Sequence, residues 1–435
     1  MNAPDRAVRA RNFALLIVLE CCWAFAVWLA HPVTVLPNFM IRLGASPFVV
    51  GLLPALWAIG TGVGALAVGP LIARRTRLGP ITGVWHLFAI IPYLGLAGVA
   101  AAAATWDLHP GLLQAAALMM FLLYDVAIGA LMNVYFFLLS RVFPGKGRSR
   151  WFGALFTISC GAGLMGPLLA STGFIREGSS LMAYAALFLT SYAFMFLGSL
   201  PFFFLREPAA RPAPPRTLAS NFIHLHGLWR KNVHLRRYLI ARMWVQVGML
   251  TGAFAATYSR EEAGLGEHTI TWFGLVAVVG EAAFSWPLGW LGSRLTSGDA
   301  SARAAYIRTQ FAVQVLVMTA LLFAALRPGL PAAMALVLVT GLCVAADLVI
   351  HPNILIEMGT PRLRADFIAL GAVALMPAMA LIGPLGGWVI EHVGHRWTFG
   401  LAALVGIPGL VNLWRLSSVR KTRNPGDGSL PSTRP

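Results

Sequence analysis

The strongest constraint on this chain is a series of continuous apolar stretches, each about as long as a bilayer is thick. A transmembrane helix needs about 20 consecutive apolar residues, whereas a strand of a membrane barrel alternates over about 10 residues. Because these stretches are continuous, and because lipid admits only helices and closed barrels, we predict membrane-spanning helices. Six precede residue 206 and six follow residue 237, at roughly 13–36, 48–71, 80–103, 111–140, 151–173, 181–205, 238–258, 270–292, 307–326, 331–355, 366–390 and 397–416.

The segment that separates the two groups of spans is basic and rich in proline. It holds seven basic residues, four prolines and one acid, Glu207. Only 11% of the whole chain is charged and 58% is hydrophobic, so we predict an all-α membrane protein. The six spans on each side of this segment predict two six-helix bundles, and the landmarks repeated in both halves predict that these bundles are pseudo-symmetric. The predicted divisions are a bundle at 1–205, a cytoplasmic linker at 206–237, a bundle at 238–418 and a disordered cytoplasmic tail at 419–435.

The distribution of basic residues predicts the orientation of the spans. Of 33 Lys and Arg residues, 27 fall in the N-terminal segment, the even-numbered connections and the C-terminal segment. This asymmetry follows the positive-inside rule and places both termini and the linker in the cytoplasm, with the spans in the plasma membrane. The basic charge therefore indicates topology, not a nucleic-acid partner. Within the linker, residues 221–229 are typical of a short amphipathic helix on the inner surface.

Sequence landmarks recur in the same order in both halves, which indicates an internal repeat. Gly69-Pro-Leu with Arg74 corresponds to Gly289-Trp-Leu with Arg294. The Gly-Pro-Leu sequence at Gly166 and Pro167 recurs at Gly383 and Pro384.

Twelve spans in two repeated halves, a long linker and G-x-L-x-x-R after spans 2 and 8 resemble the major facilitator superfamily. This resemblance implies a monomer whose halves are related by an axis along the membrane normal, with a substrate site between them near the midplane. It also implies that spans 1, 4, 7 and 10 line a central cavity, while spans 3, 6, 9 and 12 face lipid.

Two motifs of the family are partly present. The connection after span 2 is similar to G-x-x-x-D-R-x-G-R, but Ala73 replaces the acid and Ser293 occupies its place in the second half. The gating role that the family gives this connection would fall on Gly69, Arg74, Arg75, Arg77, Gly289 and Arg294, although these arginines are also consistent with simple positive-inside residues. The Gly-Pro pairs in spans 5 and 11, Gly166-Pro167 and Gly383-Pro384, resemble the family's antiporter motif. Close helix packing explains these pairs equally well.

Four acidic residues are predicted inside spans: Glu20, Asp125, Glu281 and Asp347. Each ionised carboxylate at a span centre costs about 2.5–3.5 kcal/mol on insertion scales, so it is expected to have a partner or a function. Buried carboxylates exchange protons near neutral pH, so all four are candidates for proton coupling. The alternative is that they only pair with Arg242 or with side-chain amides.

Aromatic and amide side chains accompany these acids in the same spans. Acidic and aromatic walls suit an amphipathic or cationic organic compound, whereas interfacial aromatic belts are the alternative interpretation. The candidate cavity residues are Trp23, Trp28, Tyr124, Asn133, Arg242, Trp244 and Gln246.

The sequence favours a secondary active transporter over an enzyme. It contains no G-x-S-x-G, H-E-x-x-H or P-loop pattern, and its histidines have no metal-binding spacing, so we expect no metal and no cofactor. The leading hypothesis is proton-coupled export of an amphipathic or cationic compound by alternating access. Import of a neutral solute such as a sugar is the alternative, and a non-transporting or lipid-handling protein of the same fold is a third.

Overall fold

The structure is a computed structural model that describes residues 6–31, 34–72, 75–143, 148–176, 178–207, 217–294, 300–359 and 363–418. Every regular element in these ranges is a helix. The N-terminal elements are α1 (Arg6–Leu29), α2 (Val35–Arg42), α3 (Pro47–Ile72), α4 (Gly79–Ala89), α5 (Ile91–Thr105), α6 (Pro110–Val142), α7 (Arg148–Gly163), α8 (Met165–Leu169), the π-helix η1 (Ala170–Phe174), α9 (Leu181–Ser199) and the 3-10 helix η2 (Leu200–Phe204).

The C-terminal elements follow a separate helix in the linker region, α10 (Leu218–Lys231). They are α11 (Val233–Val245), the 3-10 helix η3 (Gln246–Met249), α12 (Leu250–Ala253), α13 (Ala255–Glu261), α14 (Glu267–Arg294), α15 (Ala300–Leu326), α16 (Leu330–Met358), α17 (Arg364–Val393) and α18 (His395–Ser418). The described residues contain 11 apolar helices of membrane-spanning length, or 12 if the pair bent by 48° between Ala253 and Ala255 counts as one span. The predicted all-helical membrane fold is therefore confirmed.

The first span departs from its prediction at both ends. It was predicted at 13–36, but α1 already begins at Arg6 and ends at Leu29, and a separate helix, α2, begins at Val35. The break coincides with His31-Pro32, where proline cannot donate a backbone hydrogen bond and disfavours helical backbone in the residue before it. Hydropathy continues across this break, which is why an apolar run alone did not reveal it.

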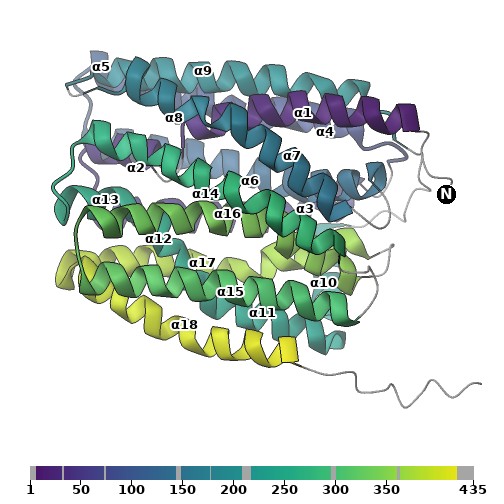
Figure 1. The fold of residues 1–435 in the computed structure, drawn as a ribbon. Coiled ribbons are helices and arrows are strands. Elements are labelled where there is room, and N and C mark those ends of the chain that lie inside the picture. The colour runs from purple at the N-terminus through teal and green to yellow at the C-terminus, as the bar shows by residue number, and fades with distance from the viewer. Residues whose placement is uncertain are drawn as a thin grey trace, which may run out of the picture.

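The bundle places α1, α5 and α9 along one edge and α15 and α18 along the opposite edge (Figure 1). The start of α1 and the end of α18 lie at the same end of the bundle (Figure 1). We call this the terminal end; the positive-inside rule predicts that it faces the cytoplasm. The predicted tail, 419–435, lies outside the described residues.

Two helix pairs join the segments before and after α10: α3 packs along α17, and α7 packs along α14. Both contacts use glycine, which lets helix backbones approach closely. A Cβ on Gly383 would lie 2.4 Å from the Gly51 carbonyl oxygen. A Cβ on Gly153 would lie 2.9 Å from the Gly289 Cα. At these two positions the paired helices leave no room for a side chain.

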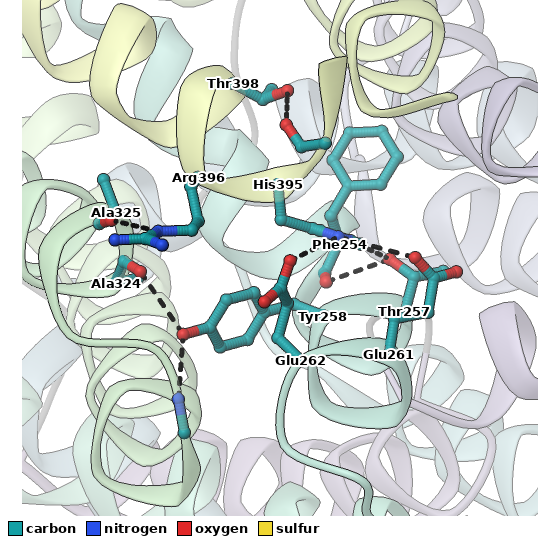
Figure 2. A network of polar contacts seen from close by, with 12 residues as sticks. Phe254, Thr257, Tyr258, Glu261, Glu262, Ala324, Ala325, His395, Arg396 and Thr398 are labelled. Atoms are coloured by element: carbon teal, nitrogen blue, oxygen red, sulfur yellow. Dashed lines mark hydrogen bonds and ion pairs between the residues drawn. The ribbon is translucent and has the colours of Figure 1, made fainter. Parts of the chain in front are cut away.

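α13 lies at the end of the bundle opposite the terminal end (Figure 1), and a polar network holds it there (Figure 2). The Tyr258 hydroxyl donates to the Ala324 carbonyl at 3.4 Å and accepts from the Gly329 N–H at 3.3 Å. His395 Nδ1 lies 3.5 Å from Glu261 Oε2, and its Nε2 lies 3.3 Å from the Thr257 hydroxyl. The bent seventh span is thereby tied to α15, α16 and α18.

Candidate functional site: a central cavity

A cavity of about 600 Å³ lies among the spans. Its walls come mainly from α1, α6, α11–α12 and α16, with contributions from α3, α7, α14, α15 and α17. The volume lies within the range of about 300–1,000 Å³ that is typical of small-molecule sites. The cavity is thus large enough for a small organic solute, and helices from both sides of the linker line it.

Glu20 and Glu281 reach this cavity from different halves of the chain. Glu20 in α1 accepts a short hydrogen bond from the Tyr135 hydroxyl. Glu281 in α14 is 5% exposed and borders the same cavity, as do Trp28 and Tyr135.

Asp347 and Arg242 form an ion pair on the cavity wall. Arg242 Nη2 lies 2.6 Å from Asp347 Oδ1. The Arg242 side chain is 2% exposed, whereas that of Asp347 is 42% exposed and borders the cavity. The pair therefore neutralises the positive charge that Arg242 brings to the cavity wall.

Asp125 lies outside the cavity wall, between α6 and α3. Its side chain is fully buried, and neither carboxyl oxygen has a hydrogen-bond partner among the described residues. A Cβ on Gly60 would lie 2.5 Å from the Asp125 Cβ, which shows how closely α3 covers this position. Asp125 is thus a buried acid within a helix interface, one residue from Tyr124, which does border the cavity.

Most of the predicted aromatic and amide residues border the cavity: Trp23, Trp28, Tyr124, Asn133 and Gln246. Trp28 stacks on His31 with 4.0 Å between ring centroids. Trp244 instead lies 44% exposed on another face of α11. It is two residues from Arg242, and two residues on a helix project in nearly opposite directions.

The cavity also includes residues that the sequence did not single out: Trp57, Ser159 and Gln314. For Gln314 a signal existed, because Gln310 and Gln314 lie four residues apart and so share one face of α15. Ser159 and Trp57 gave none, since serine and tryptophan are common in spans for other reasons.

The motif glycines and prolines occupy helix contacts. A Cβ on Gly166 would lie 2.6 Å from the Leu29 backbone nitrogen, and Pro167 packs against Gly274 of α14. Pro384 lies inside α17, next to the contact that Gly383 makes with α3. These positions are consistent with a packing role.

The connection between α3 and α4 is described only in part. Gly69 falls within α3, and Arg75 and Arg77 are exposed in the connection. Arg74 lies outside the described residues, as does the side chain of Arg294 at the end of α14.

Glu207 was not among the predicted site residues, and it caps the start of α4. Its carboxylate accepts hydrogen bonds from the backbone N–H groups of Leu78, a short contact, and Gly79, at 2.8 Å. Arg141 Nη1 lies 3.7 Å from its other oxygen. Burial raises the pKa of Glu207, and the backbone donors and Arg141 lower it by less. Glu207 thus holds the end of the sixth span against the start of the third.

The described residues contain no group of three or more His, Cys, Asp or Glu side chains that could hold a metal ion.

Known structures with the same arrangement are transporters of the major facilitator superfamily. The human organic anion transporter MFSD10 (TETRAN) aligns over 93% of this chain and 99% of its own, with a TM-score of 0.61 and 13% identity. FucP, the E. coli fucose:proton symporter, aligns in its outward conformation over 94% of this chain and 99% of its own, with a TM-score of 0.62 and 16% identity. The nucleoside transporter NupG aligns over 94% of this chain and 99% of its own, with a TM-score of 0.63 and 13% identity.

The sequence matches no protein-family model and no curated protein. The structural likeness nevertheless extends over nearly the whole chain, so the protein has the fold of the major facilitator superfamily. This confirms the fold that the sequence resemblance implied.

Proposed function

We propose that this protein is a secondary active transporter that moves a small organic solute by alternating access and couples this movement to protons. It would act as a monomer in the plasma membrane, with both termini and the linker in the cytoplasm. Its fold and the cavity lined by both halves support this proposal.

The observation that carries proton coupling is the environment of Asp125. An ionised carboxylate at this position would have neither a hydrogen bond nor a counter-ion among the described residues. Burying an unpaired charge costs far more than burying the neutral acid, so Asp125 is expected to hold its proton in this arrangement. Release would require α3 and α6 to separate enough for water or a partner to reach the carboxyl group.

The cavity chemistry favours an amphipathic cation as the solute, and we propose export as the direction. Glu20 and Glu281 face the cavity, and neither forms an ion pair within the described part of the chain. Arg242 is balanced by Asp347. Trp23 and Trp28 supply aromatic surface for stacking and cation–π contact.

A second candidate function is proton-linked import of a neutral solute. The likeness to FucP, a fucose:proton symporter, favours it. In that case Asn133, Gln246 and Gln314 would bind the hydroxyl groups of the solute, since all three amides border the cavity.

Dye efflux from cells overproducing the protein tests the proposal. We expect efflux of a fluorescent lipophilic cation that stops when a proton uncoupler is added. Asp125→Asn should abolish this uncoupler-sensitive efflux, whereas Asp107→Asn, at an exposed acid between α5 and α6, should leave it unchanged. Equal dye retention in all strains, with expression confirmed, would reject export of cations. Uptake of neutral solutes would then be measured in the same strains. If no solute moves in either direction, transport itself is rejected in favour of a non-transporting protein.

A further inference from the structure

The linker helix α10 makes specific contacts with both halves of the transporter at the terminal end. The Asn221 side chain is 1% exposed and donates to the Leu66 carbonyl of α3 at 2.8 Å. One turn further along, His224 Nε2 lies 2.9 Å from Asp366 Oδ2 in the first turn of α17. Leu225, on the same face, is 2% exposed. A single face of α10 therefore holds the ends of α3 and α17.

In the contact with α3, Asn221 donates to a carbonyl group that has no backbone donor within the helix. In an α-helix the carbonyl of Leu66 would accept from the N–H of residue 70. Residue 70 is proline and has no N–H. Asn221 supplies the missing donor, which makes this contact specific to the Gly-Pro sequence at the end of the second span.

The exposed surface of α10 is apolar at its start and basic at its end. Phe222 is 54% exposed and Ile223 is 70% exposed. Arg230 and Lys231 form the last turn and are exposed. An amphipathic helix with these two features is typical of one that lies in the headgroup region of an anionic membrane.

The depth of α10 matches that location. Leu66 lies six residues before the last residue of α3, Ile72, which corresponds to about 9 Å along the helix axis. Asp366 lies two residues after the start of α17. The helix therefore lies near the level at which the spans leave the membrane, where phosphate headgroups would meet Arg230 and Lys231.

We propose that α10 is a lipid-dependent clasp: one face holds the ends of α3 and α17 together, and the other binds the anionic inner leaflet. Opening of the cavity toward the cytoplasm separates the ends of helices from the two halves, so it requires α10 to release one of its two partners. Anionic lipid favours the docked helix and hence the state in which this end is closed.

Hydrogen exchange of the full chain in nanodiscs tests this proposal without measuring transport, so its outcome is independent of the proposed function. We compare phosphatidylcholine discs with discs that also contain phosphatidylglycerol. The amides of α10 should exchange more slowly in the anionic discs. Arg230→Ala and Lys231→Ala should each weaken this protection about fivefold, the equivalent of about 1 kcal/mol per basic residue at a membrane surface.

Matched variants separate lipid binding from charge removal in general. Arg327→Ala removes an exposed arginine from the connection between α15 and α16, at the opposite end of the bundle (Figure 1), and should leave the lipid dependence of α10 intact. Asn221→Ala should speed exchange in α10 and at the adjoining end of α3 in both kinds of disc.

Three results would overturn the proposal. Equal exchange of α10 in the two lipid mixtures would exclude the anionic leaflet as its partner. Unchanged exchange of α3 in Asn221→Ala would exclude the clasp. Protection that appears only in discs holding two copies would identify a second copy of the chain as the occupant of the apolar face.

Discussion

The ion pair between Arg242 and Asp347 makes a quantitative prediction because its two members differ in exposure. Removing one partner of a buried ion pair costs about 3–5 kcal/mol when the remaining charge stays buried. Asp347→Asn leaves the guanidinium of Arg242, whose side chain is 2% exposed, without its counter-ion. We expect this variant to lose about 3 kcal/mol, at the lower end of that range because the cavity adjoins the pair.

The reverse substitution should cost less. Arg242→Met retains most of the side-chain volume and leaves Asp347, which is 42% exposed, facing the cavity. Water in the cavity can solvate this carboxylate, so we expect a loss of about 1–2 kcal/mol. The double variant contains neither charge, and it should be more stable than Asp347→Asn alone.

Thermal unfolding in detergent measures this cycle. At about 2 °C per kcal/mol for a large chain, Asp347→Asn should unfold about 6 °C below the wild type and Arg242→Met about 2–4 °C below it. The double variant should recover part of the larger loss. Losses that simply add in the double variant would refute the reasoning, because residues in direct contact are expected to show a coupling energy.

Two further predictions concern packing and pH. Gly129→Ala should lower stability by about 1–3 kcal/mol in the same unfolding assay, because its Cβ would lie 2.3 Å from the Thr61 Cα. Gly98→Ala is the control: nothing lies within 4 Å of the new Cβ, so this change should raise stability by up to about 1 kcal/mol. Equal effects of the two substitutions would contradict the close packing of α3 against α6. Burial raises the pKa of Glu207, so the folded protein holds this proton more tightly than the unfolded chain and its contribution to stability falls as pH rises from 4.5 through the raised pKa. Glu207→Gln should remove this part of the pH dependence, and an unchanged pH profile of the unfolding temperature would contradict it.

The sequence was sufficient to predict the spans because their signal is local. An apolar run of membrane length forms a helix wherever it lies, since lipid leaves its backbone groups no other partner. The break after Leu29 was missed because proline interrupts backbone hydrogen bonding without lowering hydropathy. The start of α15 at Ala300, seven residues before its predicted start, has a related cause: polar residues at its beginning extend the helix beyond the apolar run.

The candidate site was only partly predictable, because hydropathy does not reveal which neighbour a helix face meets. Asp125 was placed in the correct span, but its side chain lies against α3, where Gly60 allows a close approach that only the assembled structure defines. The pairing of Asp347 with Arg242 was one of two alternatives, and the sequence could not choose between them. Glu207 was visible as the single acid of the linker, yet its partners on α4 are about 130 residues away in the sequence.

The most direct test of the central claim is solute accumulation in proteoliposomes that contain only the purified protein. A pH gradient is imposed, and accumulation of a fluorescent organic cation is recorded with wild type, Asp125→Asn and Asp107→Asn. We predict gradient-driven accumulation in the wild type and in Asp107→Asn, whereas Asp125→Asn should exchange the cation across the membrane without concentrating it. Accumulation by Asp125→Asn at the wild-type rate and extent would contradict the assignment of proton coupling to this buried carboxyl group.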